Sequence, residues 1–442
     1  MTLPDTITGH TAGDIADSVR MLLERGALRA DDALPPVRAL AESLGVNRNT
    51  VVAAYRLLAQ AGVVVARGRG GTRIAEVSTV ASEGVAADTV LRDIGSGNPD
   101  PALIPDPSAV LARVAGRPVL YGEPVIDRGL ADWAEQWFAA DDPTGDVVNL
   151  TITGGAVDAV ERLLAQALTR DDAVALEDPC FLASIHTVRL AGYRALPVPV
   201  DDEGMTVAGL RAALDAGARA VVITPRAQNP TGSSLSDGRA AALRDVLADH
   251  PYVLVIEDDH FSLLSTQPYR SVIGERHERW ARVRSVSKFL GPDMCLAVTA
   301  SDPVTAERLA LRLGSGTTWV SHLLQRLAHA LVTDETAAGT VATAREHYAA
   351  RNAAFAAALS RAGLPCSAGD GLSLWVEVPG TARVVADALM RRGWLARTGD
   401  EFRLADHAAS RHLRLTVHDL DDDDTALLVR DLVAAALPSR KA

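Results

Sequence analysis

The chain has 442 residues, a net charge of −12 and a hydrophobic content of 48%. This length exceeds that of one ordinary core, so we expect two or three globular domains. No apolar run approaches the ~18 residues of a membrane helix, and the N-terminus lacks the basic segment and apolar core of a signal peptide. Three widely spaced cysteines argue against a disulfide framework and against a metal knuckle, so we expect a cytoplasmic protein without a metal site.

The charge is unevenly distributed along the chain. Residues 1–75 contain nine arginines and seven acidic residues, a net charge of +2, which leaves about −14 for the remainder. A mildly basic segment ahead of an acidic one fits a nucleic-acid-binding domain joined to a larger domain. Charge alone does not establish that arrangement.

Apolar spacing predicts three helices and a hairpin near the N-terminus. The helices are expected at residues 15–24, 37–44 and 47–60, each ending at or near a glycine. Two short apolar runs, residues 63–65 and 72–74, enclose a tip of arginine and glycine and predict the hairpin. Three helices followed by a hairpin are typical of a winged helix-turn-helix.

Two stretches of this segment, residues 34–41 (Leu-Pro-Pro-Val-Arg-Ala-Leu-Ala) and 45–51 (Gly-Val-Asn-Arg-Asn-Thr-Val), closely resemble the GntR-type winged-helix family. The resemblance implies that the second helix, the start of the third helix and the hairpin tip contact DNA. The residues with these roles are Arg38, Asn47, Arg48, Asn49, Thr50, Arg67, Gly68 and Arg69. This agrees with general chemistry, because a recognition helix meets base edges with its first turn and arginines hold phosphates.

Two positions of the head leave alternatives open. Arg38 has an acidic residue four positions later, Glu42, so an ion pair within the helix competes with a DNA contact. Val52 stands where members of the family often carry a basic or polar residue, so the base preference there is open. The glycines of residues 68–71 do not form a dinucleotide loop, because no strand–helix unit surrounds them.

The chain is expected to divide into residues 1–75, a linker at 76–92 and a second domain at 93–442. The linker lacks a regular period and is rich in small and acidic residues. In the second domain, strand-like and helical segments alternate, which predicts an α/β domain with a mostly parallel sheet. Strands are expected at residues 147–153, 173–176, 220–224, 252–257 and 297–299, with a helix at 156–168.

Lysine is rare in this chain: Lys288 and Lys441 are its two lysines, against 42 arginines. Arginine replaces lysine wherever a positive charge is sufficient, but a guanidinium does not lose its proton and attack a carbonyl group. A lysine retained in mid-chain therefore points to imine chemistry, which lysine performs with pyridoxal 5′-phosphate (PLP). The alternative is a surface lysine without a role, and the neighbouring motifs decide between the two.

Motifs around Lys288 follow the order and spacing of the fold-type I PLP enzymes, the aspartate aminotransferase superfamily, which they resemble. They are residues 153–156 (Thr-Gly-Gly-Ala), 177–181 (Glu-Asp-Pro-Cys-Phe), 229–232 (Asn-Pro-Thr-Gly), 257–260 (Glu-Asp-Asp-His) and 285–288 (Ser-Val-Ser-Lys). The resemblance implies a large α/β domain with a mostly parallel sheet and a small C-terminal α+β subdomain. It also implies PLP held as an imine by Lys288.

The resemblance assigns a role to the other motif residues. Phe181 is expected to stack on the pyridine ring, although it also fits a core position, and Asn229 to hydrogen-bond the 3′-oxygen. Spacing favours Asp258 over Asp259 as the partner of the ring nitrogen, and Arg414 is expected to bind a carboxylate bidentately. The residues expected around the phosphate and the lysine are Gly154, Gly155, Ala156, Ser285 and Ser287, with Tyr121 reaching across a dimer interface.

Three positions depart from the superfamily. His260 replaces the usual tyrosine beside the 3′-oxygen, where it is expected to donate the same hydrogen bond. Cys295 replaces an arginine that usually binds the phosphate, and Val157 replaces a polar residue. Arg226 or Arg284 is a candidate to compensate, the alternative being an ordinary ion pair. These changes favour a sensor over an efficient transaminase.

A GntR-type head joined to an aminotransferase-like domain resembles the MocR regulators over nearly the whole chain. Residues 259–261 and 287–294 resemble the PtsJ-type members, which are associated with vitamin B6 salvage. The resemblance implies a head-to-tail homodimer that binds paired half-sites of double-stranded DNA and responds to PLP or a PLP–amine adduct. The alternative from another class is an active aminotransferase with an appended head. Arg414 and the intact Lys288 set favour that alternative, whereas His260 and Cys295 count against it.

Overall fold

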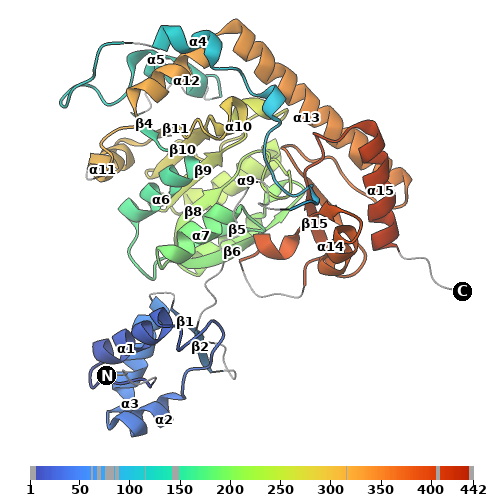
Figure 1. Cartoon of the computed structure of the whole chain (residues 1–442). Helices are drawn as coiled ribbons and strands as arrows, with labels where there is room; N and C mark the ends of the chain where they lie inside the picture. Colours follow the sequence, from blue (N-terminus) through green and yellow to red (C-terminus); the bar gives the residue numbers. More distant parts are fainter. Residues whose placement is uncertain are drawn as a thin grey trace, which may run out of the picture. The chain divides into compact units, whose positions relative to one another are not determined.

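The computed structural model describes residues 6–60, 63–66, 71–74, 84, 89–114, 116–141, 149–314, 316–404 and 409–437. Contacts define two compact units, one made mainly of Met1–Ala81 and the other of Ser82–Val188 and Tyr193–Ala442. Figure 1 shows the helices and strands of each unit. None of the helices in the described ranges has the length and apolar character required to cross a membrane.

The first unit contains three helices and a two-stranded antiparallel sheet. Helices α1 (Ala12–Glu24), α2 (Val37–Leu44) and α3 (Arg48–Gln60) are followed by strands β1 (Val64–Ala66) and β2 (Thr72–Ile74). The predicted helices and hairpin are present. The first helix begins three residues earlier than its apolar spacing indicated, because Thr11 and Asp14 form a capping box at its start.

A small apolar core holds this unit together. Ile15 and Val19 of α1 are fully buried with Val51 and Leu58 of α3. The buried residues of each helix are three or four positions apart, so they form one face and leave the opposite face to solvent. Tyr55 adds a polar tie, since its hydroxyl donates to Pro35 O at 2.7 Å.

The second unit is built on an eight-stranded sheet with the order β4-β11-β10-β9-β8-β5-β6-β7. Its strands are β4 (Asn149–Thr153), β5 (Ala173–Asp178), β6 (Arg194–Asp201), β7 (Gly204–Met205), β8 (Ala218–Ile223), β9 (Leu254–Asp259), β10 (Trp280–Ser285) and β11 (Ala297–Ser301). Strands β10, β9, β8, β5 and β6 pair in parallel, whereas β11 is antiparallel to both neighbours and β7 to β6. The expected α/β fold with a mostly parallel sheet is confirmed.

Helices cover both faces of this sheet. Val221 packs in one hydrophobic cluster with α8 (Val207–Asp215) and α9 (Asp237–Ala248), whereas the next residue, Val222, packs in another with α6 (Ala156–Ala167). Successive residues of a strand point to opposite faces, so the two clusters lie on opposite sides of the sheet. Burial on both faces explains the continuous apolar runs that predicted these strands.

The remaining helices of this part of the chain connect or flank the sheet. They are α4 (Ser108–Val114), α5 (Arg128–Ala139), α7 (Leu182–Leu190), α10 (Ser287–Leu290), α11 (Pro303–Gly314), α12 (His322–Val332) and α13 (Glu335–Arg361), with short 3-10 turns η2 (Pro101–Leu103) and η3 (Ser262–Leu264). Figure 1 shows the long helix α13 running from α12 toward the C-terminal elements. It joins the large sheet to a smaller subdomain.

The C-terminal subdomain combines a three-stranded antiparallel sheet of order β12-β15-β14 with helices. Its elements are β12 (Leu374–Glu377), α14 (Ala382–Met390), β13 (Trp394–Leu395), β14 (Arg397–Thr398), η4 (Gly399–Phe402), β15 (His412–Leu415) and α15 (Asp422–Ala436). The expected small α+β subdomain is confirmed. β3 (Arg92–Asp93) pairs in parallel with β13, so the residue expected to end the linker, Arg92, already belongs to this subdomain.

Candidate functional site

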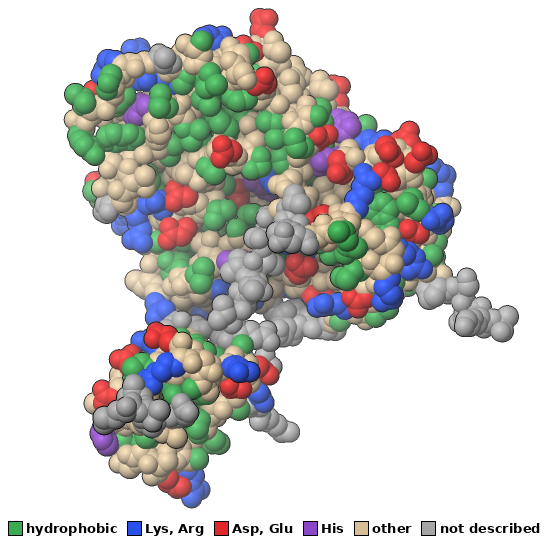
Figure 2. All heavy atoms as spheres, in the orientation of Figure 1, with side chains coloured by type: hydrophobic (Ala, Val, Ile, Leu, Met, Phe, Trp, Pro, Cys, Tyr) green, Lys and Arg blue, Asp and Glu red, His purple; other side chains and the backbone are tan. Residues whose placement is uncertain are grey.

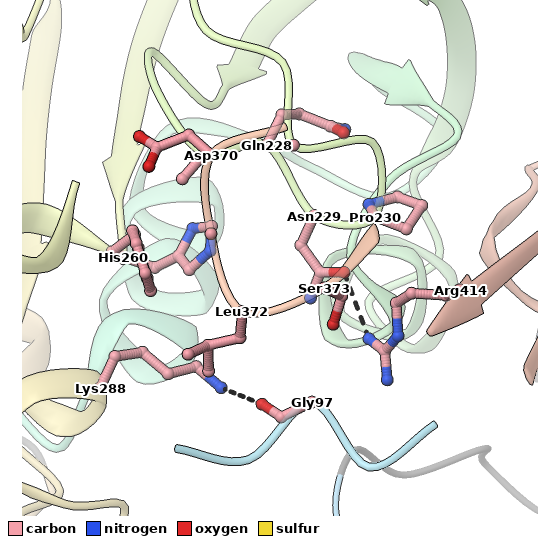
Figure 3. Close-up of a pocket in the computed structure, with 14 residues that line it drawn as sticks. Gly97, Gln228, Asn229, Pro230, His260, Lys288, Asp370, Leu372, Ser373 and Arg414 are labelled. Atoms are coloured by element: carbon pink, nitrogen blue, oxygen red, sulfur yellow. Dashed lines mark hydrogen bonds between the residues drawn. The ribbon is translucent and has the colours of Figure 1, made fainter. Parts of the chain in front are cut away.

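Lys288 lies in a pocket whose walls come from segments far apart in the sequence (Figure 3). It stands at the start of α10, three residues after the end of β10. The pocket is lined by Gly97, Ala227, Gln228, Asn229, Pro230, Gly232, His260, Phe261, Lys288, Asp370, Gly371, Leu372, Ser373 and Arg414. The fold therefore brings together four residues that the sequence analysis singled out: Asn229, His260, Lys288 and Arg414.

Asn229 and Arg414 meet on one wall of the pocket. Arg414 is fully buried in β15, and its Nη1 donates to Asn229 Oδ1 at 3.2 Å. Its guanidinium carbon lies 4.7 Å from the ring centre of Phe402, a cation–π distance. The planar fork of an arginine held in this way suits bidentate recognition of a carboxylate.

A backbone segment at the pocket contacts both Lys288 and Arg414. Gly97 O accepts a hydrogen bond from Lys288 Nζ at 3.0 Å, a contact visible in Figure 3. Gly95 O accepts one from Arg414 Nη2 at 2.6 Å. Sequence reasoning gave this segment no role. Its Gly-Ser-Gly run signals a turn, but no sequence pattern places these carbonyls beside Lys288 and Arg414.

The two adjacent aspartates at the end of β9 have different surroundings. Asp259 accepts hydrogen bonds from Arg226 Nε and Nη2, both at 2.8 Å, and its Oδ2 lies 3.3 Å from Arg284 Nε. Asp258 is buried, and within the described part of the chain its Oδ1 has no hydrogen-bond partner. Burial, with the nearby charge of Asp259, raises the pKa of Asp258 to about 7. A buried carboxyl oxygen of this kind suits a cationic N–H donor.

Arg226 and Arg284 form ion pairs with buried or partly buried carboxylates of the protein. Both bind Asp259, and Arg284 also donates to Trp137 O at 2.6 Å and pairs with Asp141. In the sequence, either arginine was a candidate to replace the missing phosphate-binding arginine at position 295. The ion-pair interpretation is the one that the geometry supports.

The turn between β4 and α6 carries the predicted glycines. Gly155 is the N-cap of α6 with a φ of 105°, a conformation that favours glycine, and no side chain caps the helix there. The first N–H groups of such a helix attract an anion. The Gly154 N–H donates to Asp158 Oδ2 at 3.0 Å, and Asp158 is paired with Arg162 Nε at 2.7 Å. Sequence reasoning did not foresee this carboxylate beside the turn.

The other predicted cofactor residues do not line this pocket. They are Gly154, Gly155, Ala156, Phe181, Asp258, Ser285, Ser287 and Tyr121. Ser285 Oγ accepts a hydrogen bond from Ser287 N at 3.2 Å, which fixes the turn before Lys288. Cys295 is exposed, and its Sγ lies 3.3 Å from Pro292 O.

Phe181 and His260 present parallel rings. Their planes differ by 8° and their centres are 6.5 Å apart. This separation is about twice the ~3.5 Å contact distance between carbon atoms. The two rings therefore do not stack face to face on each other.

Tyr121 lies on the surface rather than in the pocket of its own chain. Its side chain is 88% exposed, and its ring centre is 5.4 Å from that of Trp319. Leu120 beside it is 65% exposed and Leu323 of α12 is 61% exposed. Figure 2 shows hydrophobic side chains gathered on the face over α4, α5 and α12. Contiguous exposed apolar surfaces are typical of interaction sites.

Of the five predicted DNA contacts that the structure describes, four are exposed. Arg48 and Asn49 are exposed at the start of α3, and Thr50 is half-buried. Asn47 caps this helix, since its Oδ1 accepts from Asn49 N at 2.9 Å. Arg38 pairs with Glu42 at 3.3 Å, but both side chains are largely exposed, so this pair contributes little and leaves the arginine accessible.

Three predicted contacts at the hairpin tip, Arg67, Gly68 and Arg69, lie outside the described residues.

Comparison with known families accounts for most of the chain. Residues 122–432 match the family Aminotransferase class I and II. Residues 11–74 match the family Bacterial regulatory proteins, gntR family. The gntR match covers α1 to β2, so the first unit is a DNA-binding domain. The aminotransferase match covers most of the second unit, and PLP is the cofactor of this domain.

Similar proteins share the same combination. The chain is 48% identical over 427 residues to the vitamin B6 salvage pathway transcriptional repressor PtsJ of Salmonella typhimurium, covering 96% of this chain and 98% of that protein. It is 24% identical over 382 residues to the probable rhizopine catabolism regulatory protein MocR of Rhizobium meliloti, covering 78% and 76%.

A solved structure shares the fold of the second unit. The kynurenine aminotransferase of Pyrococcus horikoshii, solved in complex with PMP, superposes with a TM-score of 0.72 at 20% identity, covering 80% of this chain and 93% of that one. With a gntR-type head ahead of an aminotransferase domain, and this level of identity to a regulator along almost its full length, the chain belongs to the MocR family of transcriptional regulators.

Proposed function

We propose that this protein represses or activates vitamin B6 salvage genes according to the supply of PLP. The similarity to PtsJ over nearly the whole chain supports the pathway. The observation that carries the proposal is that the mid-chain lysine, Lys288, lines a pocket together with Asn229 and Arg414. The same chain also carries a gntR-type head. A regulator needs both a ligand site and a DNA-binding unit, and the chain supplies both.

The residues near Lys288 fit PLP. When bound, PLP supplies a carbonyl group for a lysine amine and a pyridine ring that withdraws electrons. The buried Oδ1 of Asp258, which has no hydrogen-bond partner among the described residues, would accept from a protonated ring nitrogen. Asn229 offers its side-chain amide to a ring oxygen. The neighbouring residue, Gln228, donates from Nε2 to Glu177 Oε2 at 3.2 Å, which fixes the turn that carries Asn229.

The flat ring and the phosphate also have places to bind. The parallel rings of Phe181 and His260 offer aromatic faces for stacking against a flat ring. This orientation makes stacking by His260 an alternative to the hydrogen bond expected from the sequence. The uncapped start of α6 at Gly155 offers N–H groups to a phosphate.

The grip on the phosphate is expected to be weak. Cys295 supplies no positive charge, Arg226 and Arg284 are bound to Asp259, and Asp158 adds a carboxylate beside the helix start. A loosely held PLP molecule exchanges with the cellular pool. Such exchange serves a sensor, whereas an efficient enzyme retains its cofactor.

An active aminotransferase is the second candidate, and Arg414 favours it. A fully buried arginine at the pocket wall is a suitable carboxylate clamp for an amino acid. Incubating the PLP-loaded protein with a panel of amino donors and keto acids tests this candidate. Turnover on the order of 1 s⁻¹ or faster would support an enzyme, and its absence together with DNA binding supports a regulator.

The regulator is proposed to act as a head-to-tail homodimer. Tyr121 and the exposed apolar residues Leu120 and Leu323 would lie at the interface, where Tyr121 reaches the phosphate in the partner subunit. Two heads, each on a linker of residues 76–92, then bind paired half-sites on DNA through the predicted contacts of α2, α3 and the hairpin tip.

DNA binding by the purified protein tests the proposal. The fragments are those upstream of its own gene and of vitamin B6 salvage genes, with unrelated DNA as control. Salt is held fixed, because phosphate contacts make affinity salt-dependent. A several-fold change in affinity for one of these fragments on adding PLP supports the proposal. Equal binding to all fragments with and without PLP contradicts it.

A further inference from the structure

Residues 94–100, which we call the strap, run from the pocket to the segment that leads to the head. The strap follows β3 in the chain, and Gly84, within the expected linker, donates its N–H to Ser96 O at 3.0 Å. The carbonyl groups on either side of Ser96 accept hydrogen bonds from the pocket: Gly95 O from Arg414 and Gly97 O from Lys288. Three consecutive carbonyl groups therefore connect the ligand-binding residues with the linker.

Ligand chemistry in the pocket competes with the strap for the same donors. Lys288 has three N–H donors as an ammonium group, and an amine joined to a carbonyl compound keeps one at most. Attachment of PLP at Lys288 therefore weakens the bond to Gly97 O. A carboxylate bound bidentately by Arg414 competes in the same way with Gly95 O.

The opposite side of the strap is anchored by groups outside this competition. Gly97 N donates to Thr416 Oγ1 at 3.1 Å, and Asp100 N donates to Tyr348 OH at 3.1 Å. His418 Nε2 lies 2.9 Å from Asn98 O. These contacts hold the strap in one arrangement as long as the pocket side chains also hold it. Loss of the pocket contacts leaves a segment held from one side.

We infer that the strap transmits occupancy of the pocket to the linker and so to the DNA-binding head. The inference rests on the proposed function and identifies the strap as the segment whose arrangement changes. A ligand shifts DNA affinity by its differential affinity for the two strap arrangements, for which about five- to 150-fold is typical. By reciprocity, DNA that favours one arrangement changes PLP affinity by the same factor.

Hydrogen exchange of the full-length protein tests this inference. The expected result is faster exchange of the strap amides and of Gly84 N when PLP is added to wild type, with no change in Lys288→Ala. If DNA affinity responds to PLP while strap exchange does not, the inference is overturned and the proposed function stands. If neither responds, both are wrong.

A variant outside the pocket adds a causal test. Thr416→Val removes the acceptor of Gly97 N and should speed strap exchange without PLP. It should also move the DNA affinity of PLP-free protein several-fold toward the PLP-loaded value. Thr299→Val is the matched control, because Thr299 is equally buried and its hydroxyl has no partner in the described structure. Identical behaviour of the two variants would overturn the inference.

A second, independent observation concerns base recognition by α3. Val52 is 46% exposed, although its neighbour Val51 is fully buried. At 100° per residue, Arg48, Asn49, Val52 and Arg56 lie within about 100° of helical arc, and all four are exposed. An apolar side chain thus stands within the polar surface that a recognition helix turns toward the major groove.

We propose that Val52 reads a thymine in each half-site. The 5-methyl of thymine is the apolar group that base pairs offer in the major groove, and side chains with methyl groups contact it. The polar neighbours of Val52 are suited to phosphates and base edges, so they fix the helix while the valine selects the base. Burial of one methyl group corresponds to an affinity change of about fourfold.

Methyl deletion on both partners tests this proposal, which rests on the DNA binding of the head. DNA sites are selected from random sequence with the full-length protein, and each thymine is then replaced by deoxyuridine. At one position per half-site, wild type should lose about fourfold in affinity, whereas Val52→Ala should bind both forms equally. Leu57→Ala is the control, since Leu57 is exposed on α3 outside this arc and should keep the discrimination.

Two results would overturn the role of Val52. One is a selected site in which no thymine methyl affects binding. The other is a Val52→Ala protein that keeps the wild-type preference for thymine over deoxyuridine. Failure to select any sequence would contradict the role of Val52 and sequence-specific binding by the head together.

Discussion

The amine of Lys288 donates a hydrogen bond to the carbonyl oxygen of Gly97 at 3.0 Å. This contact joins the residue expected to bind PLP to a backbone segment that the linker also contacts. We infer that this contact begins the route by which ligand binding affects the DNA-binding head.

Introducing arginine at position 295 should strengthen PLP binding. Cys295→Arg adds a charge-assisted hydrogen bond to the phosphate, typically about 1.5–3 kcal/mol, so the dissociation constant should fall roughly tenfold to hundredfold. Equilibrium dialysis or the visible absorbance of bound cofactor measures it. Cys295→Ala should bind as wild type does, and equal affinity of all three proteins would show that the phosphate lies elsewhere.

Neutralising Asp259 should cost stability. Asp259→Asn leaves the buried guanidinium groups of Arg226 and Arg284 without their shared carboxylate, and breaking a buried pair typically costs about 3–5 kcal/mol. Urea unfolding of the PLP-free protein measures the loss. A free energy of unfolding close to that of wild type would mean that the two arginines find other partners.

The neighbouring change, Asp258→Asn, should act on PLP instead. It removes the acceptor proposed for the ring nitrogen, so PLP affinity should fall at least tenfold, without the loss of stability expected of Asp259→Asn. If Asp259→Asn weakened PLP binding and Asp258→Asn lowered stability instead, the roles assigned to the two aspartates would be reversed.

Asp258 should also give the PLP-free protein a distinct pH dependence. Burial raises its pKa from 3.8 to about 7, so the folded state holds a proton that the unfolded state releases. The stability from this proton is fully present below about pH 4 and is lost as pH rises through about 7. Wild type should therefore lose stability relative to Asp258→Asn between about pH 4 and pH 7, measured by urea unfolding. A constant difference would exclude the raised pKa.

Charges on the exposed apolar face should separate the proposed dimer. Leu120 and Leu323 are 65% and 61% exposed, so replacing both with glutamate should leave the fold intact but place charges at the interface. Sedimentation should then show a monomer with weakened DNA binding. Glutamate in place of Val384, an exposed residue of α14, is the control. A double variant that remains dimeric would place the interface on another face.

The sequence predicted the elements whose local pattern is strong. Buried strands such as β9 appear as continuous apolar runs, and α2 lies between a Pro-Pro pair and Gly45, so both were found with nearly correct bounds. The first helix was shortened because its capping box carries no apolar period. Motif order was enough to bring Asn229, Lys288 and Arg414 together.

Other features depend on contacts between distant residues and were missed for that reason. The strap is a short glycine-containing stretch, and its carbonyls reach Lys288 and Arg414 only through tertiary packing. The partners of Arg226 and Arg284 likewise come from β9, since both bind Asp259. A charge in the sequence does not reveal whether it faces a ligand or a buried counter-ion.

The most direct test compares DNA affinity with and without PLP in wild type and Lys288→Ala. Fluorescence anisotropy with labelled DNA from upstream of the gene, at fixed salt, gives all four dissociation constants. We predict that PLP changes the wild-type value several-fold, and that Lys288→Ala binds DNA but does not respond. An equal response in Lys288→Ala, or none in wild type, would contradict regulation through this lysine.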